Sequence, residues 1–250
     1  MTATESRPAH AHGEGPARGV QSVKFSLYRV ADQARRAGAA ERAALGDALT
    51  ALLERSSERM LTRVYSTAGT RADTDFLIWQ VHDELPVIMD WHAELLRSPL
   101  GGVLERPHSF LSMTMRSLYA NPLHAGAAQR ERLRTDGGAS AYLFVYPMAK
   151  TRGWYELPAA ERQRMMEQHI AVGHRYHGIK INTTYSYGLD DQEFVVAFEG
   201  DDPGEFLALV RELRDSEASR YTRFDTPMFT CRLLAARDLA AHLGWAWAPR

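Results

Sequence analysis

The sequence predicts an α+β fold made of two tandem ferredoxin-like units. The main observation is an internal repeat, because residues 75–98 align without a gap with residues 193–216. In each copy, an apolar run turns at an aspartate and continues with Leu or Phe at spacings of three and four, which indicates a strand followed by a helix. Further strands and helices flank each copy, so that both halves show the order strand, helix, strand, strand, helix, strand. Two such sheets packed face to face would enclose a pocket.

The elements around the repeat are assigned from the same periodicities. Pro158 suits the first turn of a helix, where the N–H that proline lacks would have no partner. In chain order, the segments are a strand at 23–30, helices near 31–60, a strand at 109–115, a strand at 141–148, a helix at 158–176, and strands at 180–187 and 228–233.

Composition sets the outer boundaries of this organisation. The first 20 residues are rich in Ala, Gly, Pro and His and poor in large apolar side chains, so we expect a disordered tail. The last segment, 235–250, is rich in Ala, Leu and Trp and predicts a helix that packs on the body or on a neighbouring subunit. Between them we expect a first unit at 21–120, a polar linker at 121–140 and a second unit at 141–234.

Charge and cysteine content exclude several classes of function. The formal net charge of −1 gives no basic surface for nucleic acid or for an acidic membrane. The single cysteine, Cys231, allows neither a disulfide framework nor a Cys-based metal cluster. The sequence lacks an apolar run of membrane-spanning length and a signal-peptide pattern at its start. We therefore expect a soluble cytoplasmic protein.

The segment 146–169 carries most of the chemistry. It combines Tyr146, Lys150 and Trp154 with His169, which lies on the apolar stripe of the predicted helix. A tyrosine, a cation, a tryptophan and an imidazole are the side chains expected around a buried haem or porphyrin. Taken singly, each has a plainer interpretation: a core histidine satisfied by one hydrogen bond, a packing tyrosine and a solvated lysine. Periodicity alone favours these plainer interpretations.

The order of the motifs favours the first interpretation. The runs at 146–150, 154–158 and 161–169 resemble the chlorite dismutase-like haem protein family, and within it the coproheme decarboxylases of haem synthesis. Residues 188–191, 198–202 and 217–221 extend the resemblance, which is strong over 132–229 and weaker over 20–131. The family implies a dimeric α+β barrel whose first half holds no haem, and a homopentamer.

The resemblance also implies roles for individual residues. His169 corresponds to the proximal iron ligand, and Glu217 to the carboxylate that accepts a hydrogen bond from its other ring nitrogen. Tyr146 corresponds to the tyrosine that forms a radical, and Lys150 to the lysine at the reacting propionate. Three more residues correspond to positions around the porphyrin: Trp154, Met148 and Arg132, the last as a partner for another propionate.

The distal side departs from the family pattern. Chlorite dismutases have an arginine on the strand after the histidine helix, where this chain has Ile181 or Asn182. Oxygen evolution from chlorite is therefore not expected. Asn182 could replace the glutamine, or His124 the histidine, that different decarboxylases use on this side. Leu118 also replaces a polar residue that is common near a propionate.

These observations lead to three hypotheses. The first is peroxide-dependent oxidative decarboxylation of two propionates of iron coproporphyrin III (coproheme) to give haem b, with hydrogen peroxide as co-substrate and a tyrosyl radical on Tyr146. The second is a haem b protein of the same family with a peroxidase-like or sensing role. The third is a ferredoxin-like binding or assembly protein without cofactor.

Overall fold

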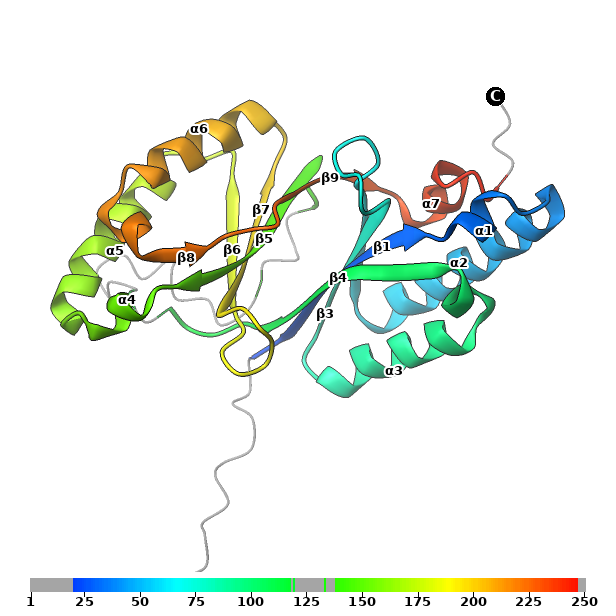
Figure 1. Ribbon diagram of the computed structural model, residues 1–250, viewed down its shortest axis with the longest axis horizontal. Helices are drawn as coiled ribbons and strands as arrows, with labels where there is room; N and C mark the ends of the chain where they lie inside the picture. The colour runs from blue at the N-terminus through cyan, green and yellow to red at the C-terminus, as the bar shows by residue number, and fades with distance from the viewer. Residues whose placement is uncertain (1–19, 118, 120–132, 134–137, 247–250) are drawn as a thin grey trace, which may run out of the picture.

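The computed structural model describes residues 20–117, 119, 133 and 138–246 (Figure 1). Its strands form one antiparallel sheet in the order β7-β6-β4-β1-β3-β2-β9-β5-β8, and β5 also pairs with β7. Helices cover the outer sides, with α4, α5 and α6 at one end of the molecule and α1, α2, α3 and α7 at the other (Figure 1). The α+β class with a large antiparallel sheet is therefore confirmed.

The two halves contain similar elements. The first half has, in chain order, β1 (Ser22–Val30), α1 (Asp32–Arg35), α2 (Ala39–Arg59), β2 (Leu61–Ser66), β3 (Phe76–His82), α3 (Leu85–Arg97), the 3-10 helix η1 (Pro99–Gly102) and β4 (Leu104–Met113). The second half has β5 (Tyr142–Lys150), α4 (Arg152–Glu156), α5 (Ala159–Gly173), β6 (Lys180–Tyr185), β7 (Phe194–Gly200), α6 (Pro203–Arg214), the 3-10 helix η3 (Glu217–Tyr221), β8 (Thr222–Phe224), β9 (Phe229–Leu234) and α7 (Ala236–His242).

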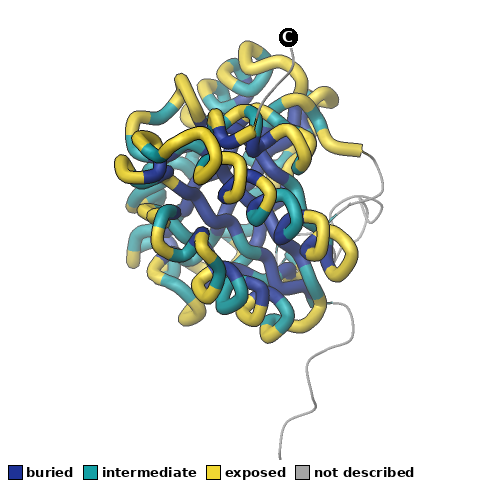
Figure 2. The backbone as a smooth tube through the Cα atoms, turned by 90° about the vertical axis from the view of Figure 1, so that its right-hand side faces the viewer, coloured by how far each residue is buried: buried dark blue, intermediate teal, exposed yellow. Residues whose placement is uncertain are grey.

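Among the described residues, three of the four buried apolar clusters contain residues of these strands and follow from the alternation of side chains along them. The inner core joins both halves and includes Phe25 and Trp79, whose rings stack at 5.3 Å, together with Val145 and Phe229. The first helix core lies under α2, α3 and α7, and the second helix core lies between β5, β7 and the helices α5 and α6. Figure 2 shows the buried residues gathered in the centre of the molecule. The strands β1, β3, β5 and β7 are therefore buried along most of both faces, which explains the nearly continuous apolar sequences of β3, β5 and β7.

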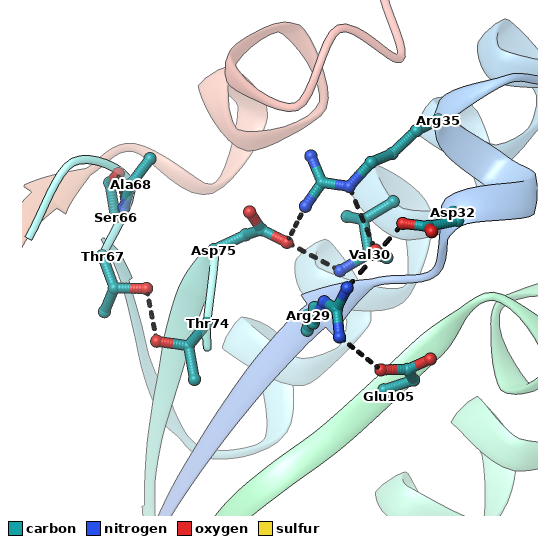
Figure 3. Close-up of polar contacts among 10 residues, drawn as sticks. All are labelled: Arg29, Val30, Asp32, Arg35, Ser66, Thr67, Ala68, Thr74, Asp75 and Glu105. Carbon is teal, nitrogen blue, oxygen red and sulfur yellow. Dashed lines mark hydrogen bonds and ion pairs between the residues drawn. The ribbon is translucent and has the colours of Figure 1, made fainter. Parts of the chain in front are cut away.

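A carboxylate at the start of β3 fixes the end of β1 (Figure 3). Asp75 Oδ2 accepts hydrogen bonds from Val30 N at 2.7 Å and from Arg35 Nη2 at 2.6 Å. The backbone of the same residue completes the corner, because Asp75 N donates to Tyr28 O at 2.8 Å. One aspartate thus joins β1, β3 and the short helix α1.

The second half repeats this corner at the equivalent positions. Glu193 Oε2 accepts from Lys150 N at 2.7 Å, and Glu193 N donates to Met148 O at 3.1 Å. The turns that precede these carboxylates also match, because Gly69 and Gly188 have positive φ angles of 84° and 71°. Only glycine adopts this backbone conformation without strain. The internal repeat therefore extends to individual hydrogen bonds.

The assignments from sequence match most element positions. The strand-helix order requires a strand before the first repeat copy, and β2 fills that place although no range was assigned to it. The short elements α4 and β8 were also not anticipated. Within the segment 235–250, for which a helix was predicted, the helix α7 covers only Ala236–His242. Leu239 of α7 and Trp245, which follows it, pack on the body in the first helix core. The tail at 1–20 and the linker at 121–140 lie mostly outside the described residues.

A buried ion pair links the two halves. Arg63 Nη1 on β2 lies 2.5 Å from Glu199 Oε2 on β7, and their side chains are only 10% and 1% exposed. Lys180 Nζ and Asn182 Nδ2 lie 3.1 and 3.0 Å from the other oxygen of the same carboxylate. The Arg63 guanidinium also lies over the ring of Trp79, at 5.4 Å from its centre. The buried carboxylate is thus neutralised by groups from both halves.

Replacing this carboxylate should therefore be costly. We expect Glu199→Ala to lower the free energy of unfolding by about 3–5 kcal/mol, because it leaves Arg63 buried without its counter-charge. The matched control is Glu94→Ala, which removes an exposed ion pair with Arg55 and should cost about 0–1 kcal/mol. Urea denaturation measures both. Equal losses in the two variants would contradict a special role for the buried pair.

Candidate functional site

Strand β5 carries three of the predicted residues. Its register on β7 pairs Tyr146 with Val196 and Met148 with Phe194, and these four residues belong to the second helix core or pack against it. Leu143 and Val145, one position out of phase, point into the inner core. Tyr146 and Met148 therefore lie on the face of the sheet that α5 and α6 cover.

His169 lies on α5, and its ring is held by a serine. Its Nδ1 atom is 3.1 Å from Ser216 Oγ, and the Ser216 hydroxyl donates its proton to Leu213 O at 2.6 Å. Because a hydroxyl has only one proton, Oγ must accept a hydrogen bond from His169 Nδ1–H. The imidazole is then fixed in the tautomer whose Nε2 carries a free lone pair, the form that binds a metal ion.

The charge state of the imidazole agrees with this tautomer. Burial lowers the pKa of His169 to about 4, and the positive charge of Lys150 lowers it further in the same direction. The ring is therefore neutral at physiological pH, as metal ligation requires.

Lys150 is held by the same segment as His169. Its Nζ donates to the backbone oxygen of Ala218 at 2.9 Å and lies 4.8 Å from the ring centre of Trp154. Burial lowers the pKa of Lys150 to about 8, and the nearby charge of Glu193 opposes part of this shift. The segment Ser216–Ala218 thus places an imidazole from α5 and an ammonium from β5 close to each other.

Glu217 makes a different contact from the one expected. Its two carboxylate oxygens accept from Arg164 Nη1 and Nη2 at 3.1 and 2.7 Å, in a paired arrangement near the surface. This guanidinium lowers the pKa of the Glu217 carboxyl. The acceptor beside His169 is Ser216 instead, which the sequence analysis did not identify. Ser216 directly precedes Glu217 at the end of the repeated segment 193–216, and this closeness in sequence is the signal that could have identified it.

Trp154 lies on α4 and is buried. Its indole is 2% exposed and packs with Met165 and Ala218 in a small apolar cluster. The rings of Tyr119 and Tyr221 lie 6.2 and 5.6 Å away. The indole forms a rigid apolar wall beneath the Lys150 ammonium, with a cation–π contact that favours the charged amine.

Tyr146 is almost completely buried, with 8% of its surface exposed. Its ring stacks on Phe198 at 6.0 Å. Burial, and then the negative charge of Asp225, raise the pKa of Tyr146, and Arg214 opposes them. Asp225 and Arg214 themselves form an ion pair at 2.5 Å. The phenol therefore keeps its proton throughout the physiological pH range.

The structure does not bring Asn182 to this face. Asn182 pairs with Ala197 in the β6–β7 register, and both lie on the inner side, where Asn182 is bound to Glu199. Thr183 pairs with Val196, which is also the partner of Tyr146, so Thr183 rather than Asn182 shares the face of Tyr146. Ile181 is on that face too and is 43% exposed. Arg132, Leu118 and His124 lie outside the described residues.

The donor set fits an iron porphyrin. Within the described part of the chain, no group of three or more His, Cys, Asp or Glu side chains could hold a bare metal ion. A single neutral imidazole suits iron whose remaining in-plane ligands come from a porphyrin. Apolar side chains of the second helix core suit the macrocycle, and the Lys150 ammonium suits a propionate carboxylate.

Comparisons with known proteins give the family of this chain. The profile of the chlorite dismutase family matches residues 42–234. The chain belongs to the chlorite dismutase family. It is 28% identical over 225 residues to a coproheme decarboxylase of Mycolicibacterium smegmatis, covering 90% of this chain and 94% of that protein. It is 34% identical over 189 residues to a coproheme decarboxylase of Thermus thermophilus, covering 72% and 74%.

Solved structures show the same fold. A chlorite dismutase variant from Candidatus Nitrospira defluvii superposes with a TM-score of 0.80 at 19% sequence identity, covering 91% of this chain and 96% of that one.

Among the helices of the described residues, none is both long and apolar enough to cross a membrane.

The serine that holds His169 gives a testable prediction. We expect Ser216→Ala to weaken ferric porphyrin binding by about tenfold or more, because loss of such a hydrogen bond frees the orientation of a ligand histidine. The matched control is Ser219→Ala, since Ser219 donates to Arg214 O and Ser216 O in the same segment. Titration of the Soret band measures both affinities. Equal weakening in the two variants would assign the effect to the segment rather than to the imidazole.

Proposed function

We propose that this protein decarboxylates two propionates of coproheme to give haem b, with hydrogen peroxide as oxidant. The observation that carries the proposal is the segment Ser216–Ala218, which holds a neutral imidazole of defined tautomer beside a partly buried ammonium group. The coproheme decarboxylases from Mycolicibacterium smegmatis and Thermus thermophilus support the choice of reaction within the family.

The reaction balances for each propionate. One propionic acid group and one hydrogen peroxide give a vinyl group, one carbon dioxide and two waters. Besides carbon dioxide, the propionic acid group loses two electrons and two protons, which peroxide accepts to form the two waters. When bound, the iron porphyrin supplies the redox centre through which peroxide withdraws these electrons.

His169 has the role of proximal ligand in this proposal. Its Nε2 lone pair faces away from the Ser216 contact, and the ring needs no proton loss before it binds iron. By the family resemblance, Met148 and Trp154 are proposed to lie beside the macrocycle, and both belong to apolar clusters next to Tyr146 and Lys150. Arg132 is proposed as a partner for a propionate that does not react.

Lys150 has the role of binding the reacting propionate. An ammonium on a partly buried strand end gains more from a carboxylate than a solvated one does, since the local dielectric is low. Its lowered pKa, about 8, also allows it to give a proton to the carboxylate or to take one back near neutral pH. The Trp154 ring below limits where the amine can move.

Tyr146 has the role of hydrogen-atom acceptor. Because its pKa is raised, it starts as the neutral phenol. Loss of its phenolic proton and one electron gives a tyrosyl radical. This radical takes a hydrogen atom from the propionate carbon that is attached to the porphyrin ring. The phenol is restored, the substrate loses a second electron, and the bond to the carboxylate breaks as carbon dioxide leaves.

The distal side remains open in this proposal to His124 or to a site without a basic side chain. Asn182 is bound to Glu199 on the other face of the sheet and would have to leave a buried ion network to serve there. By the same family resemblance, we propose that the fold closes as a dimeric α+β barrel and that the protein assembles as a homopentamer.

The experiment is to load the protein with coproheme, titrate hydrogen peroxide, and follow the porphyrin mass by chromatography. Successive loss of two carboxyl groups is expected. Tyr146→Phe should still bind porphyrin yet lose decarboxylation, because phenylalanine cannot form the radical. The matched control is Tyr142→Phe, which lies on the same face of β5 and stacks on Phe144 at 6.2 Å. It should keep the activity.

Two outcomes would count against the proposal. Full turnover by Tyr146→Phe would remove the radical mechanism. Bleaching of the wild-type complex without loss of carbon dioxide would indicate a haem b protein with a peroxidase-like or sensing role.

A further inference from the structure

One carboxylate oxygen connects the end of β5 to the helix α4. Glu193 Oε2 accepts from Lys150 N at 2.7 Å and from Tyr155 O–H at 2.6 Å. Lys150 is the last residue of β5, and Tyr155 lies on α4. Glu193 therefore fixes the position of the strand end relative to the helix.

Both partners of Glu193 adjoin groups assigned to the site. The side chain of Lys150 extends from the backbone that Glu193 binds, and Trp154 directly precedes Tyr155. The distance of 4.8 Å between Lys150 Nζ and the Trp154 ring centre thus depends on two anchors that meet at one oxygen. A second tie lies nearby, since Thr151 N donates to Tyr221 O at 2.7 Å.

A second tyrosine side chain, that of Tyr187, extends this network to the surface. Tyr187 O–H lies 3.0 Å from the Tyr155 oxygen, and Tyr187 is 46% exposed. Because Tyr155 gives its proton to Glu193, Tyr187 must donate to Tyr155. Burial, and then the hydrogen bond to Glu193, raise the pKa of Tyr155, so that it remains a donor at physiological pH.

The equivalent corner of the first half shows which parts of this arrangement are repeated and which differ. Asp75 forms the same bond to the end of β1, but its second partner is the half-exposed guanidinium of Arg35 (Figure 3). In the second half the carboxylate is one methylene longer, and its second partner is the tyrosine beside Trp154. The strand-end bond and a link to the short helix that follows are therefore common to both halves. The second half differs in the linking residue, which is the tyrosine beside Trp154 instead of an arginine.

We propose that Glu193 is a positioning residue, which holds Lys150 and Trp154 in register through Tyr155 for the substrate's carboxylate. The proposal rests on the proposed function for the identity of the substrate. The link itself can be measured without turnover. Loss of this link should let Lys150 and Trp154 move relative to each other while His169 still binds iron.

Hydrogen exchange and porphyrin spectra test the link. In Glu193→Ala, amide exchange should accelerate at 150–156, and the induced circular dichroism of the bound ferric porphyrin should change. Glu193→Gln should restore both, because its amide oxygen accepts the same two hydrogen bonds. The matched control is Asp75→Ala, in which exchange should accelerate at 30–36 and the porphyrin signal should stay as in the wild type.

Kinetics give a second readout. With coproheme and peroxide, Glu193→Ala should lose about tenfold or more in kcat with KM nearly unchanged, because misplacement of a reacting group acts on the rate. Tyr155→Phe removes the link to α4 together with the contact to Tyr187, but keeps the bond of Glu193 to Lys150 N, and it tests the proposal if Glu193→Ala fails to fold. A wild type without decarboxylase activity would overturn the proposed function and leave the exchange and dichroism results standing.

Two outcomes would contradict a positioning role for Glu193. If Glu193→Ala and Asp75→Ala lose similar stability, and neither alters the dichroism or kcat, Glu193 serves the fold alone and the proposal is wrong. An unchanged spectrum and rate in Tyr155→Phe would remove the role of α4 in the same way.

Discussion

The pairing of β5 on both of its edges is the constraint on which the site depends. Because β7 binds one edge and β9 the other, the strand cannot rotate, and its side chains alternate between two cores. Leu143 and Val145 close the inner core, so Tyr146 and Met148 must face the helices. A shift of the β5 register by one residue would turn Tyr146 and Met148 toward the inner core and the other two side chains toward the helices. The inner core therefore orients the predicted reactive tyrosine without touching its hydroxyl.

The candidate site residues lie in one half of a repeated framework, and the other half has different side chains at the equivalent positions. At the position where Tyr146 opposes Val196, the first half has Ser26 opposite Ile78. The residue bound by the corner carboxylate is Lys150 in one half and Val30 in the other. The framework is thus shared down to its corner hydrogen bonds, while the side chains with redox or charge chemistry occur at the matching positions of the second half.

The sequence was sufficient for the features that repeat along the chain. The α+β class, the paired strand-helix units and the stripe that holds His169 all follow from local periodicity and the internal repeat. Periodicity does not specify which residue of a neighbouring strand shares a face, so the position of Asn182 opposite Ala197 required the register. The contact of His169 with Ser216 was also hidden, because the hydroxyl comes from a segment 47 residues away. Resemblance supplied the histidine, but tertiary packing chose its acceptor.

The choice of serine over a carboxylate has a consequence for the proposed substrate, coproheme, which carries several carboxylates. A negative charge beside His169 would oppose a polyanionic porphyrin and compete for Lys150. Glu217, the adjacent carboxylate, is instead paired with Arg164 through both of its oxygens. The neutral hydroxyl of Ser216 orients the imidazole without adding charge, and the Lys150 ammonium is bound to a carbonyl oxygen rather than to a carboxylate. Because a carbonyl oxygen is neutral, it does not cancel the positive charge of the ammonium. The arrangement therefore favours the binding of a negatively charged propionate by Lys150.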